Sequence, residues 1–194
     1  LAGFAVGVVD RPKIIDGRSI VPGDVLIGLA STGLHSNGYS LARRVLLDQA
    51  KLSMTSRLPE LDQPLGDVLL TPTRIYAKQI LTLIQQYPIK GIAHITGGGI
   101  TENLPRVFPP GVRAQVQRNA WSVPPIFHAI ARLGQVEREE MYRVFNMGIG
   151  LILVVSASDA QSVVSQAASM GDPACRIGTI VESSGEGPLV EYVD

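Results

Sequence analysis

Two polar, glycine-containing loops are the places in this sequence where side chains and backbone could do chemistry. The first spans residues 31–38 (STGLHSNG) and the second spans residues 96–99 (TGGG). Each follows an apolar run of strand length and precedes a segment with helical spacing. The first N–H groups of a helix have no partner within it and carry partial positive charge, and glycines let the backbone approach an anion closely.

Hydroxyl, amide and imidazole groups in the first loop can bind a phosphate or sugar hydroxyls. The glycines of the second loop predict a phosphate cradle at the start of a helix. The candidate binding residues are His35, Ser36, Asn37, Gly38, Thr96, Gly97, Gly98 and Gly99. A structural explanation stays open, because three glycines also form tight turns where a strand and a helix pack closely. The loops match neither a Walker loop nor a dinucleotide loop.

His94 stands at the end of an apolar segment, just before the second loop. It is a candidate for a general acid or base, and a hydrogen-bonded core histidine is the alternative. No metal site is predicted: Glu137, Glu139 and Glu140 resemble a solvated helix face, although carboxylates suit Mg²⁺. Cys175 is the only cysteine, so it forms no internal disulfide and builds no zinc site by itself.

The elements that must position these residues alternate between strand and helix patterns. Expected strands cover 4–9, 25–30, 91–95, 112–116, 148–155, 176–181 and 189–193. Expected helices cover 39–49, a segment from Thr71-Pro72 to residue 87, 100–107, 125–133, 137–142 and a segment following Ser158. Residues 52–66 are expected to form a surface excursion, and a turn at 183–185 joins the last two strands. This order, with two hairpins, favours an α/β (α+β) fold in which helices pack on a mixed sheet. We treat residues 1–194 as one domain.

Composition excludes several classes of protein. The 194 residues carry 17 Lys+Arg and 17 Asp+Glu, and 45% of them are hydrophobic. That length and hydrophobicity suit a folded core and exclude a disordered tail. The balanced charge offers no footprint for nucleic acid, and no apolar stretch approaches the ~20 residues of a membrane span. We expect a soluble intracellular domain with no nucleic-acid or membrane partner. Because the chain opens at Leu1 in a strand-like segment, we expect it to be a piece of a longer polypeptide.

Residues 31–41 closely resemble the phosphoribosylformylglycinamidine cyclo-ligase (AIR synthetase) family. The same family is matched at 93–99 with 102–106, and at 140–148. The opening residues 1–4 and residues 71–76 match as well. These motifs occur in the same order along the chain as in the family, and together they extend over nearly the whole chain. The resemblance is to the C-terminal half of the enzyme.

The resemblance implies a mixed sheet with helices on it and an active cleft between two halves. The full enzyme, expected to be a cytoplasmic homodimer, uses ATP to activate the formamide oxygen of formylglycinamidine ribonucleotide. A neighbouring nitrogen then attacks, giving aminoimidazole ribonucleotide, ADP and phosphate. ATP and Mg²⁺ would be bound mainly by the N-terminal half, so the isolated chain is expected to be inactive. The two loops would hold the substrate's ribose phosphate, with Asn103 and Asn146 as orienting amides.

Two other hypotheses belong to different classes. The chain could be the matching domain of a related ATP-dependent enzyme, such as formylglycinamidine synthase, selenophosphate synthetase or thiamine monophosphate kinase. It could also be a non-catalytic module that binds phosphate, or a structural domain that binds nothing at the glycine loops.

Overall fold

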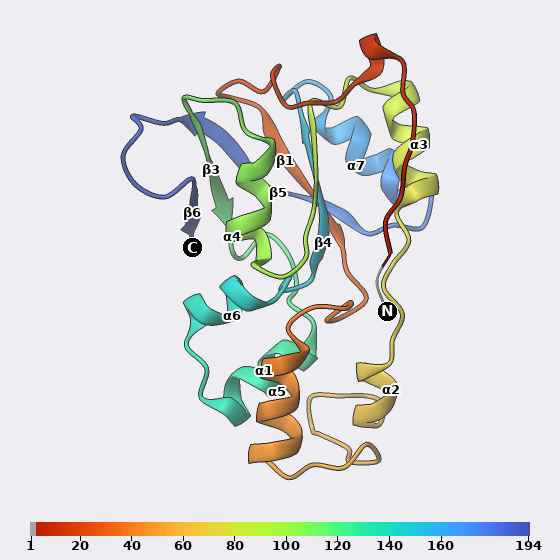
Figure 1. The fold of residues 1–194 in the computed structure, drawn as a ribbon, viewed down its shortest axis with the longest axis vertical. Helices are drawn as coiled ribbons and strands as arrows, with labels where there is room; N and C mark the ends of the chain where they lie inside the picture. Colours follow the sequence, from red (N-terminus) through yellow and green to blue (C-terminus); the bar gives the residue numbers. More distant parts are fainter. Residues whose placement is uncertain (1–2) are drawn as a thin grey trace.

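A six-stranded mixed sheet forms the larger part of the protein in this computed structural model, which describes residues 3–194 (Figure 1). Its strands are β1 (Val25–Ala30), β2 (Gly91–His94), β3 (Val112–Gln117), β4 (Ile149–Val155), β5 (Ala174–Glu182) and β6 (Val190–Val193). They lie in the order β2-β4-β1-β5-β3-β6. All neighbours are antiparallel except β3 and β6, which are parallel. The predicted mixed sheet is confirmed.

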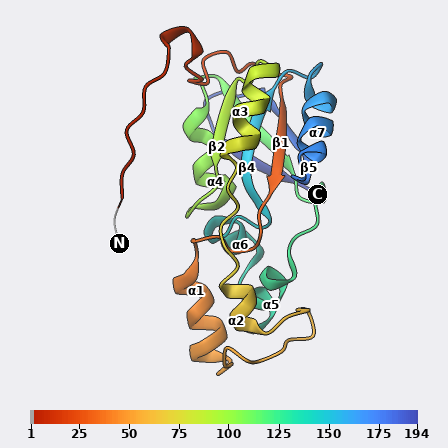
Figure 2. The ribbon, with the colours of Figure 1, turned by 90° about the vertical axis from the view of Figure 1, so that its right-hand side faces the viewer.

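Helices cover both faces of the sheet and form a separate helical part at one end of it. They are α1 (Tyr39–Arg43) with its π-helical extension (Arg44–Gln49), α2 (Leu65–Leu69), α3 (Ala77–Gln86), α4 (Gly99–Asn103) with a 3₁₀ extension (Leu104–Val107), α5 (Pro125–Gly134), α6 (Arg138–Val144) and α7 (Ala160–Ser169). A short 3₁₀ turn covers Arg11–Lys13. Helices α3 and α7 lie on one face of the sheet and α4 on the other, whereas α1, α2, α5 and α6 lie beyond its end (Figure 2).

Alternation along the central strands separates two layers of core. Val25, Ile27 and Leu29 of β1 pack toward α3 and α7. Leu26 belongs to the layer on the opposite face, under α4. Successive side chains of a strand point to opposite faces, so both faces of β1 are apolar and both must be covered. A third apolar cluster, which includes Phe127 and Phe145 with ring centroids 5.5 Å apart, holds the helical part together.

The strand predicted at residues 4–9 is wrong for the described chain. These residues are extended and exposed, with Phe4 94% and Val8 102% accessible. Their alternating apolar pattern is typical of a strand, but a strand also needs a hydrogen-bonded neighbour, and none of the described strands pairs with them. Residues 3–10 instead run as an extended arm that stands away from α3 and from the sheet (Figure 2). Leu1 and Ala2 of the opening motif lie outside the described residues.

The predicted helix start at Thr71-Pro72 is also wrong, because α3 begins at Ala77. Residues 71–76 are extended and tied to the sheet by side chains. Tyr76 is buried and its hydroxyl donates to the Ala30 carbonyl at 2.8 Å, while Arg74 pairs with Asp172 at 2.6 Å. These tertiary contacts outweigh the local capping signal. The predicted excursion at 52–66 is largely irregular, although α2 begins at Leu65.

The two closing strands exist but do not pair with each other. β3 lies between β5 and β6, and β6 runs parallel to β3 with Ala114 opposite Val190. The loop around 183–185 therefore crosses over β3 and is no hairpin turn. In the part of the chain that the structure describes, no helix is long and apolar enough to span a bilayer.

Candidate functional site

The two candidate loops meet at one edge of the sheet. β1 and β2 are each antiparallel to β4, so they run parallel to each other and end on the same side. The loops that follow them are joined by a hydrogen bond of 3.0 Å from the backbone N–H of Gly97 to Asn37 Oδ1. The site predicted from two distant stretches of sequence is thus one continuous surface.

A third segment, residues 145–148, enters the same edge because it leads into β4 between the two loops. Asn146 is 1% accessible and its Nδ2 donates to the Gly33 carbonyl at 2.8 Å. Its Oδ1 accepts from Ser31 Oγ at 3.0 Å and from the Gly148 N–H at 2.8 Å. The buried amide of Asn146 therefore connects the first loop to the start of β4 through hydrogen bonds.

Asn103 does the same for the glycine loop. Its Nδ2 donates to the carbonyls of Gly97 and Gly99 at 3.1 and 2.8 Å, and its Oδ1 accepts from Thr96 Oγ1 at 3.0 Å. The side chain is 3% accessible. Both amides that we expected to bind substrate are buried and hydrogen-bonded to the backbone of the two loops.

The three glycines of the second loop differ in their surroundings. Gly97 is exposed, and a Cβ there would lie 3.9 Å from its nearest neighbour, Asn37 Oδ1. Gly98 has φ +95° and precedes α4. Gly99 is buried with φ +58°, and a Cβ there would approach the Tyr142 carbonyl oxygen to 2.0 Å. Close packing of α4 against α6 therefore explains Gly99.

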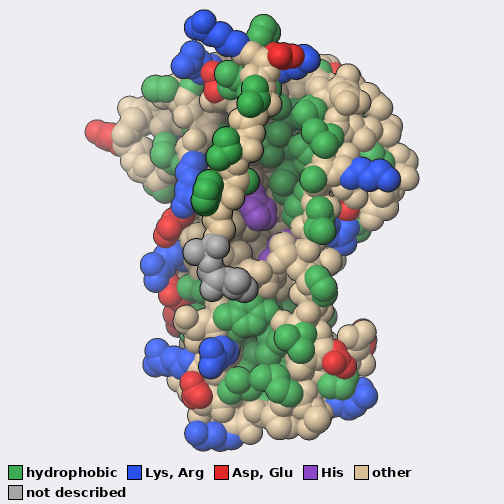
Figure 3. Space-filling view, turned by 45° about the vertical axis from the view of Figure 1, so that its right-hand side comes forward, with side chains coloured by type: hydrophobic (Ala, Val, Ile, Leu, Met, Phe, Trp, Pro, Cys, Tyr) green, Lys and Arg blue, Asp and Glu red, His purple; other side chains and the backbone are tan. Residues whose placement is uncertain are grey.

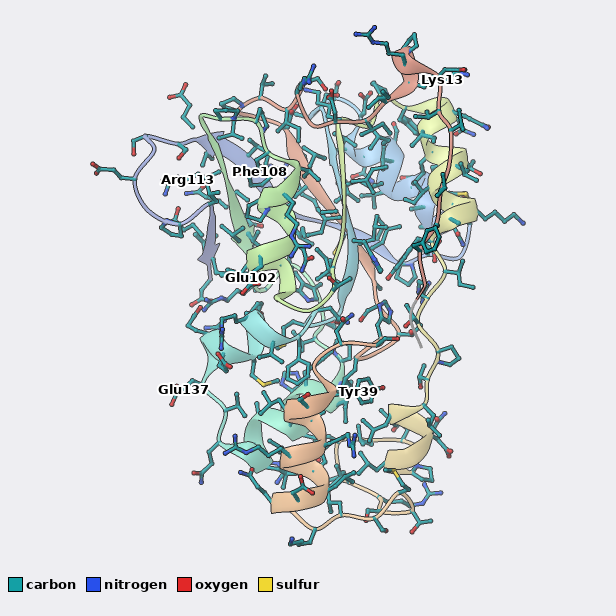
Figure 4. All side chains as sticks on the ribbon, in the orientation of Figure 1. Lys13, Tyr39, Glu102, Phe108, Arg113 and Glu137 are labelled. Carbon is teal, nitrogen blue, oxygen red and sulfur yellow. The ribbon has the colours of Figure 1, made fainter. Side chains whose placement is uncertain are left out.

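Two features reduce the anion affinity expected from the glycines alone. The N–H of Gly97 is already used by Asn37. The carboxylate of Glu102 lies over Gly98, since a Cβ on Gly98 would come within 2.5 Å of Glu102 Oε2. Figure 4 shows Glu102 on α4, beside the sheet, and Tyr39 at the start of α1, in the helical part. The narrower region between these two parts is the waist of the molecule. Within the described residues, the N–H groups of Gly98 and Ile100 make no hydrogen bond; Gly98 is partly exposed, whereas Ile100 is buried.

His35 is buried in the wall of the first loop, with 4% of its surface accessible and φ +57°. Its Nε2 accepts the backbone N–H groups of Thr32 at 3.1 Å and Arg74 at 3.4 Å. Burial, with help from His94 and Arg74, lowers the pKa of His35 to about 4. The imidazole is therefore neutral at neutral pH and is no cation for a phosphate.

His94 lies at the exposed end of β2, beside the buried Tyr76. The two rings meet edge-on with centroids 6.4 Å apart, and the Tyr76 and His35 centroids are 6.2 Å apart. Within the described residues the His94 side chain is exposed and makes no hydrogen bond. Figure 3 shows histidine side chains at the floor of a hollow at the waist of the molecule, with hydrophobic side chains along its sides.

Gly150 of β4 makes room for this aromatic group. A Cβ on Gly150 would lie 2.1 Å from Tyr76 Oη and 2.5 Å from His35 Cε1. Any side chain there would push the tyrosine and the histidine out of place. Burial raises the pKa of Tyr76, so its hydroxyl stays protonated and donates to Ala30.

A cavity of about 440 Å³ adjoins His35 and is rich in hydroxyl groups. Its lining residues are His35, Ser36, Tyr39, Leu69, Leu70, Thr71, Pro72 and Thr73. Ser36 Oγ and Thr73 Oγ1 lie 3.1 Å apart, and the Tyr39 hydroxyl donates to the Leu69 carbonyl. Such a lining suits a polar, oxygen-rich ligand.

The described residues contain no group of three or more His, Cys, Asp or Glu that could hold a metal ion. The carboxylates of Glu139 and Glu140 pair with Arg118 and Arg143, respectively. Burial raises the pKa of the Cys175 thiol, which makes it a poor nucleophile.

Comparison with known proteins shows which family this chain belongs to. Residues 21–191 match the family model described as "AIR synthase related protein, C-terminal domain". The chain belongs to this family. Its relatives include a phosphoribosylformylglycinamidine cyclo-ligase of Myxococcus xanthus, 54% identical over 190 residues, and one of Geotalea uraniireducens, 49% identical over 193 residues. They cover 98% and 100% of this chain, which in turn covers 55% and 56% of them. The chain therefore spans about half the length of these relatives.

Solved structures of lower identity share the fold of this AIR synthase related domain. Thiamine-monophosphate kinase from Stenotrophomonas maltophilia superposes with a TM-score of 0.62 at 18% identity, covering 95% of this chain and 54% of the kinase chain. Thermotoga maritima PurL complexed with FGAR gives 0.52 at 15% identity, covering 89% of this chain and 26% of that one. At these identities the likeness concerns the fold alone.

Sequence reasoning missed four residues that hold the site of this AIR synthase related domain together. They are Ser31, Arg74, Tyr76 and Asp172. Arg74 and Tyr76 stand in a stretch that was interpreted as a helix, so their contacts with the first loop were not foreseen. Gly150 is a signal in the sequence that points to these contacts, because a glycine inside a buried strand often marks a place where another group packs closely against the strand.

Proposed function

We propose that this chain supplies the substrate-phosphate side of the active cleft of a phosphoribosylformylglycinamidine cyclo-ligase. The reaction would be ATP-dependent ring closure of formylglycinamidine ribonucleotide to aminoimidazole ribonucleotide in purine biosynthesis. Two relatives of that name are 54% and 49% identical in sequence to this chain, over 98% and 100% of its length. The observation that carries the assignment of the phosphate side is the Asn37–Gly97 hydrogen bond, which makes one surface of the two candidate loops.

This surface would hold the ribose phosphate while the reacting groups meet elsewhere in the cleft. Ser36, Asn37 and the free N–H of Gly98 are the proposed phosphate and sugar contacts. Buried Asn103 and Asn146 keep both loops rigid, because each makes three or more hydrogen bonds. A rigid grip favours ring closure, since correct orientation of reacting groups lowers the entropic part of the barrier.

His94 is the proposed general acid or base. It is exposed at the end of β2 and has no hydrogen-bond partner among the described residues, so its ring nitrogens are available to a substrate. Its edge-on contact with the buried Tyr76 ring helps to hold the imidazole in place. Proton transfer to or from the closing ring is the role that this placement supports.

ATP and Mg²⁺ are assigned to the other half of the longer protein. The carboxylates of the described residues form no cluster that fits Mg²⁺, so no step through the metal is derived for this chain. We assign charge stabilisation of the transferring phosphoryl group to that half as well.

An active cleft between two halves is supported by the distribution of exposed hydrophobic side chains. Most of them lie in residues 3–15 and on the segment from α2 to α3: Phe4, Val6, Val8, Val9, Ile14, Ile15, Leu70, Ile75, Leu81 and Ile84. Large exposed apolar patches mark surfaces that other polypeptide covers. A homodimeric, cytoplasmic whole protein is part of the same proposal and rests on the family resemblance.

The test is production of aminoimidazole ribonucleotide from formylglycinamidine ribonucleotide and ATP. We expect turnover by the full-length protein and none by this chain alone. Turnover by the chain alone would overturn the assignment of ATP to the other half. An inactive full-length protein would contradict the cyclo-ligase proposal, and sugar-phosphate binding without turnover would favour a non-catalytic module.

A further inference from the structure

The imidazole of His35 has one nitrogen that accepts two hydrogen bonds and one that makes no hydrogen bond with the described residues. Nε2 accepts two backbone N–H groups, from Thr32 and from Arg74. Nδ1 is buried and has no hydrogen-bond partner in the part of the chain described. The two nitrogens therefore have different roles.

The two bonds to Nε2 decide which nitrogen carries the proton. A neutral imidazole has one N–H donor and one acceptor, and a nitrogen that receives backbone N–H groups must be the acceptor. The proton of His35 is therefore on Nδ1. A second proton is opposed by burial and by the two cationic or titratable groups nearby, His94 from β2 and Arg74 from residues 71–76. Arg74 is itself paired with Asp172, and the Tyr76 hydroxyl is engaged with Ala30.

The ring is fixed in place as well as in tautomer. Its backbone has φ +57°, a conformation that costs energy for a residue other than glycine. Gly150 lies against Cε1, next to Nδ1, and any side chain in its place would displace the ring. His35 also lines the hydroxyl-rich cavity together with Ser36 and Thr73.

A buried N–H without a partner costs about 1–3 kcal/mol, so proteins rarely leave one unused. A strained residue at a ligand loop is a typical place for such a cost to be kept. Resting on the function proposed above, we propose that the Nδ1–H of His35 is a hydrogen-bond donor of fixed tautomer, reserved for an acceptor oxygen of the bound sugar phosphate. His35 then selects for an acceptor without adding a positive charge, whereas a protonated histidine would also attract negative charge.

The tautomer can be measured directly in this chain with ¹⁵N-labelled histidine. Two-bond ¹H–¹⁵N NMR spectra between about pH 5.5 and pH 8.5 should show Nδ1 protonated and Nε2 unprotonated throughout. Adding ribose 5-phosphate should move the Nδ1–H resonance downfield. Inorganic phosphate is the second probe: the same shift identifies a phosphate oxygen as the acceptor, and a shift with ribose 5-phosphate alone identifies a sugar oxygen.

Three outcomes decide against the inference. A proton on Nε2 overturns it. An unchanged Nδ1–H resonance, while the amides of Asn37 and Gly97 respond to the probe, overturns it and leaves the proposed ligand site standing. A chain that binds neither probe contradicts both.

The variant that isolates the donor is His35→Gln, because the glutamine oxygen can replace Nε2 as acceptor while no N–H remains at the δ position. Its affinity for ribose 5-phosphate should fall about tenfold to a hundredfold. His128→Gln, at an exposed histidine of α5, is the matched control and should bind normally. Affinity of the His35→Gln variant within about twofold of the unaltered chain would contradict the proposal. If that variant does not fold, the NMR measurement on the unaltered chain still decides.

Discussion

Asn37 Oδ1 and the backbone N–H of Gly97 are hydrogen-bonded at 3.0 Å although 60 residues separate them in the chain. The bond joins the loop after β1 to the loop after β2, on either side of the entry to β4. It also decides which glycine-loop amides remain free for a ligand, because Gly97 is used and Gly98 is not. The shape of the proposed phosphate site therefore depends on this one contact.

Replacing Asn37 separates the roles of geometry and charge. Asn37→Ala removes the bond between the loops and should weaken ribose 5-phosphate binding about tenfold, with a loss of about 0.5–1.5 kcal/mol in the free energy of unfolding. Asn37→Asp keeps an acceptor oxygen, so its stability should stay near that of the unaltered chain, but its negative charge should repel the phosphate. Calorimetric titration and thermal denaturation measure the two effects. Unaltered binding by both variants would remove Asn37 from the ligand site.

The glycines of the second loop allow a test in which one substitution is the control for the other. Gly99→Ala places a Cβ 2.0 Å from the Tyr142 carbonyl oxygen at a φ of +58°, and should cost at least about 3 kcal/mol of stability. Gly97→Ala has room, with its nearest atom 3.9 Å away, and should fold normally. Because its methyl group would stand on the exposed surface of the loop, it should weaken phosphate binding. Normal affinity of the Gly97→Ala chain would argue that the anion binds elsewhere.

The sequence is a good guide to the central strands and a poor one to what surrounds them. β1 and β4 are continuous apolar runs of strand length, and both were predicted within one residue of their observed bounds. The segment 71–76 carries a helix-start signal, yet it is extended because Tyr76 and Arg74 reach Ala30 and Asp172. Local patterns cannot reveal such distant partners. The order of the strands in the sheet cannot be read from local sequence patterns either, and this order brings Asn37 close to Gly97.

The same limit applies to the candidate site. Residue types indicated hydroxyls, amides and glycines near a helix start, but not which of them face the groove. Asn103 and Asn146 are turned inward because buried backbone carbonyls and N–H groups need partners. The close approach of the Tyr142 carbonyl is by itself enough to require glycine at position 99. A polar residue in a loop can serve a ligand or the loop itself, and only the packing distinguishes these roles.

His94 offers a test of catalysis that does not disturb the fold. It is exposed and makes no hydrogen bond within the described residues, so His94→Asn should leave the unfolding free energy within about 0.5 kcal/mol of the unaltered protein. If His94 is the general acid or base, kcat of the full-length protein should fall about 10²–10⁴-fold while KM changes little. His128→Asn, at an exposed histidine of α5, is the control. Equal kcat values for the two variants would exclude His94 from the chemistry.

The Arg74–Asp172 pair should be among the most important ion pairs for stability. Asp172 is 3% accessible, and Asp172→Ala leaves the Arg74 guanidinium without its partner. We expect a loss of about 2–4 kcal/mol, below the cost of a fully buried pair because water still reaches Arg74. Asp10→Ala breaks the exposed pair with Lys13 and should cost less than about 1 kcal/mol. Denaturant unfolding of both variants checks this order, and an equal loss in the two would contradict it.

The pH dependence of stability provides a test of His35 that needs no ligand. Its pKa is about 4 in the folded chain and 6.5 in the unfolded chain, so below pH 6.5 the unfolded chain binds a proton that the folded one excludes. The contribution of His35 is therefore fully present above pH 6.5 and is lost as the pH falls toward 4, by up to roughly 3 kcal/mol. The His35→Gln variant lacks this titration, so the difference in unfolding free energy between it and the unaltered chain should shrink over that range. The carboxylates shared by both chains cancel in this comparison. A difference that stays constant from pH 7 to pH 4 would mean that His35 accepts its second proton as readily in the folded chain as in the unfolded one, and the buried neutral imidazole described here would then be wrong.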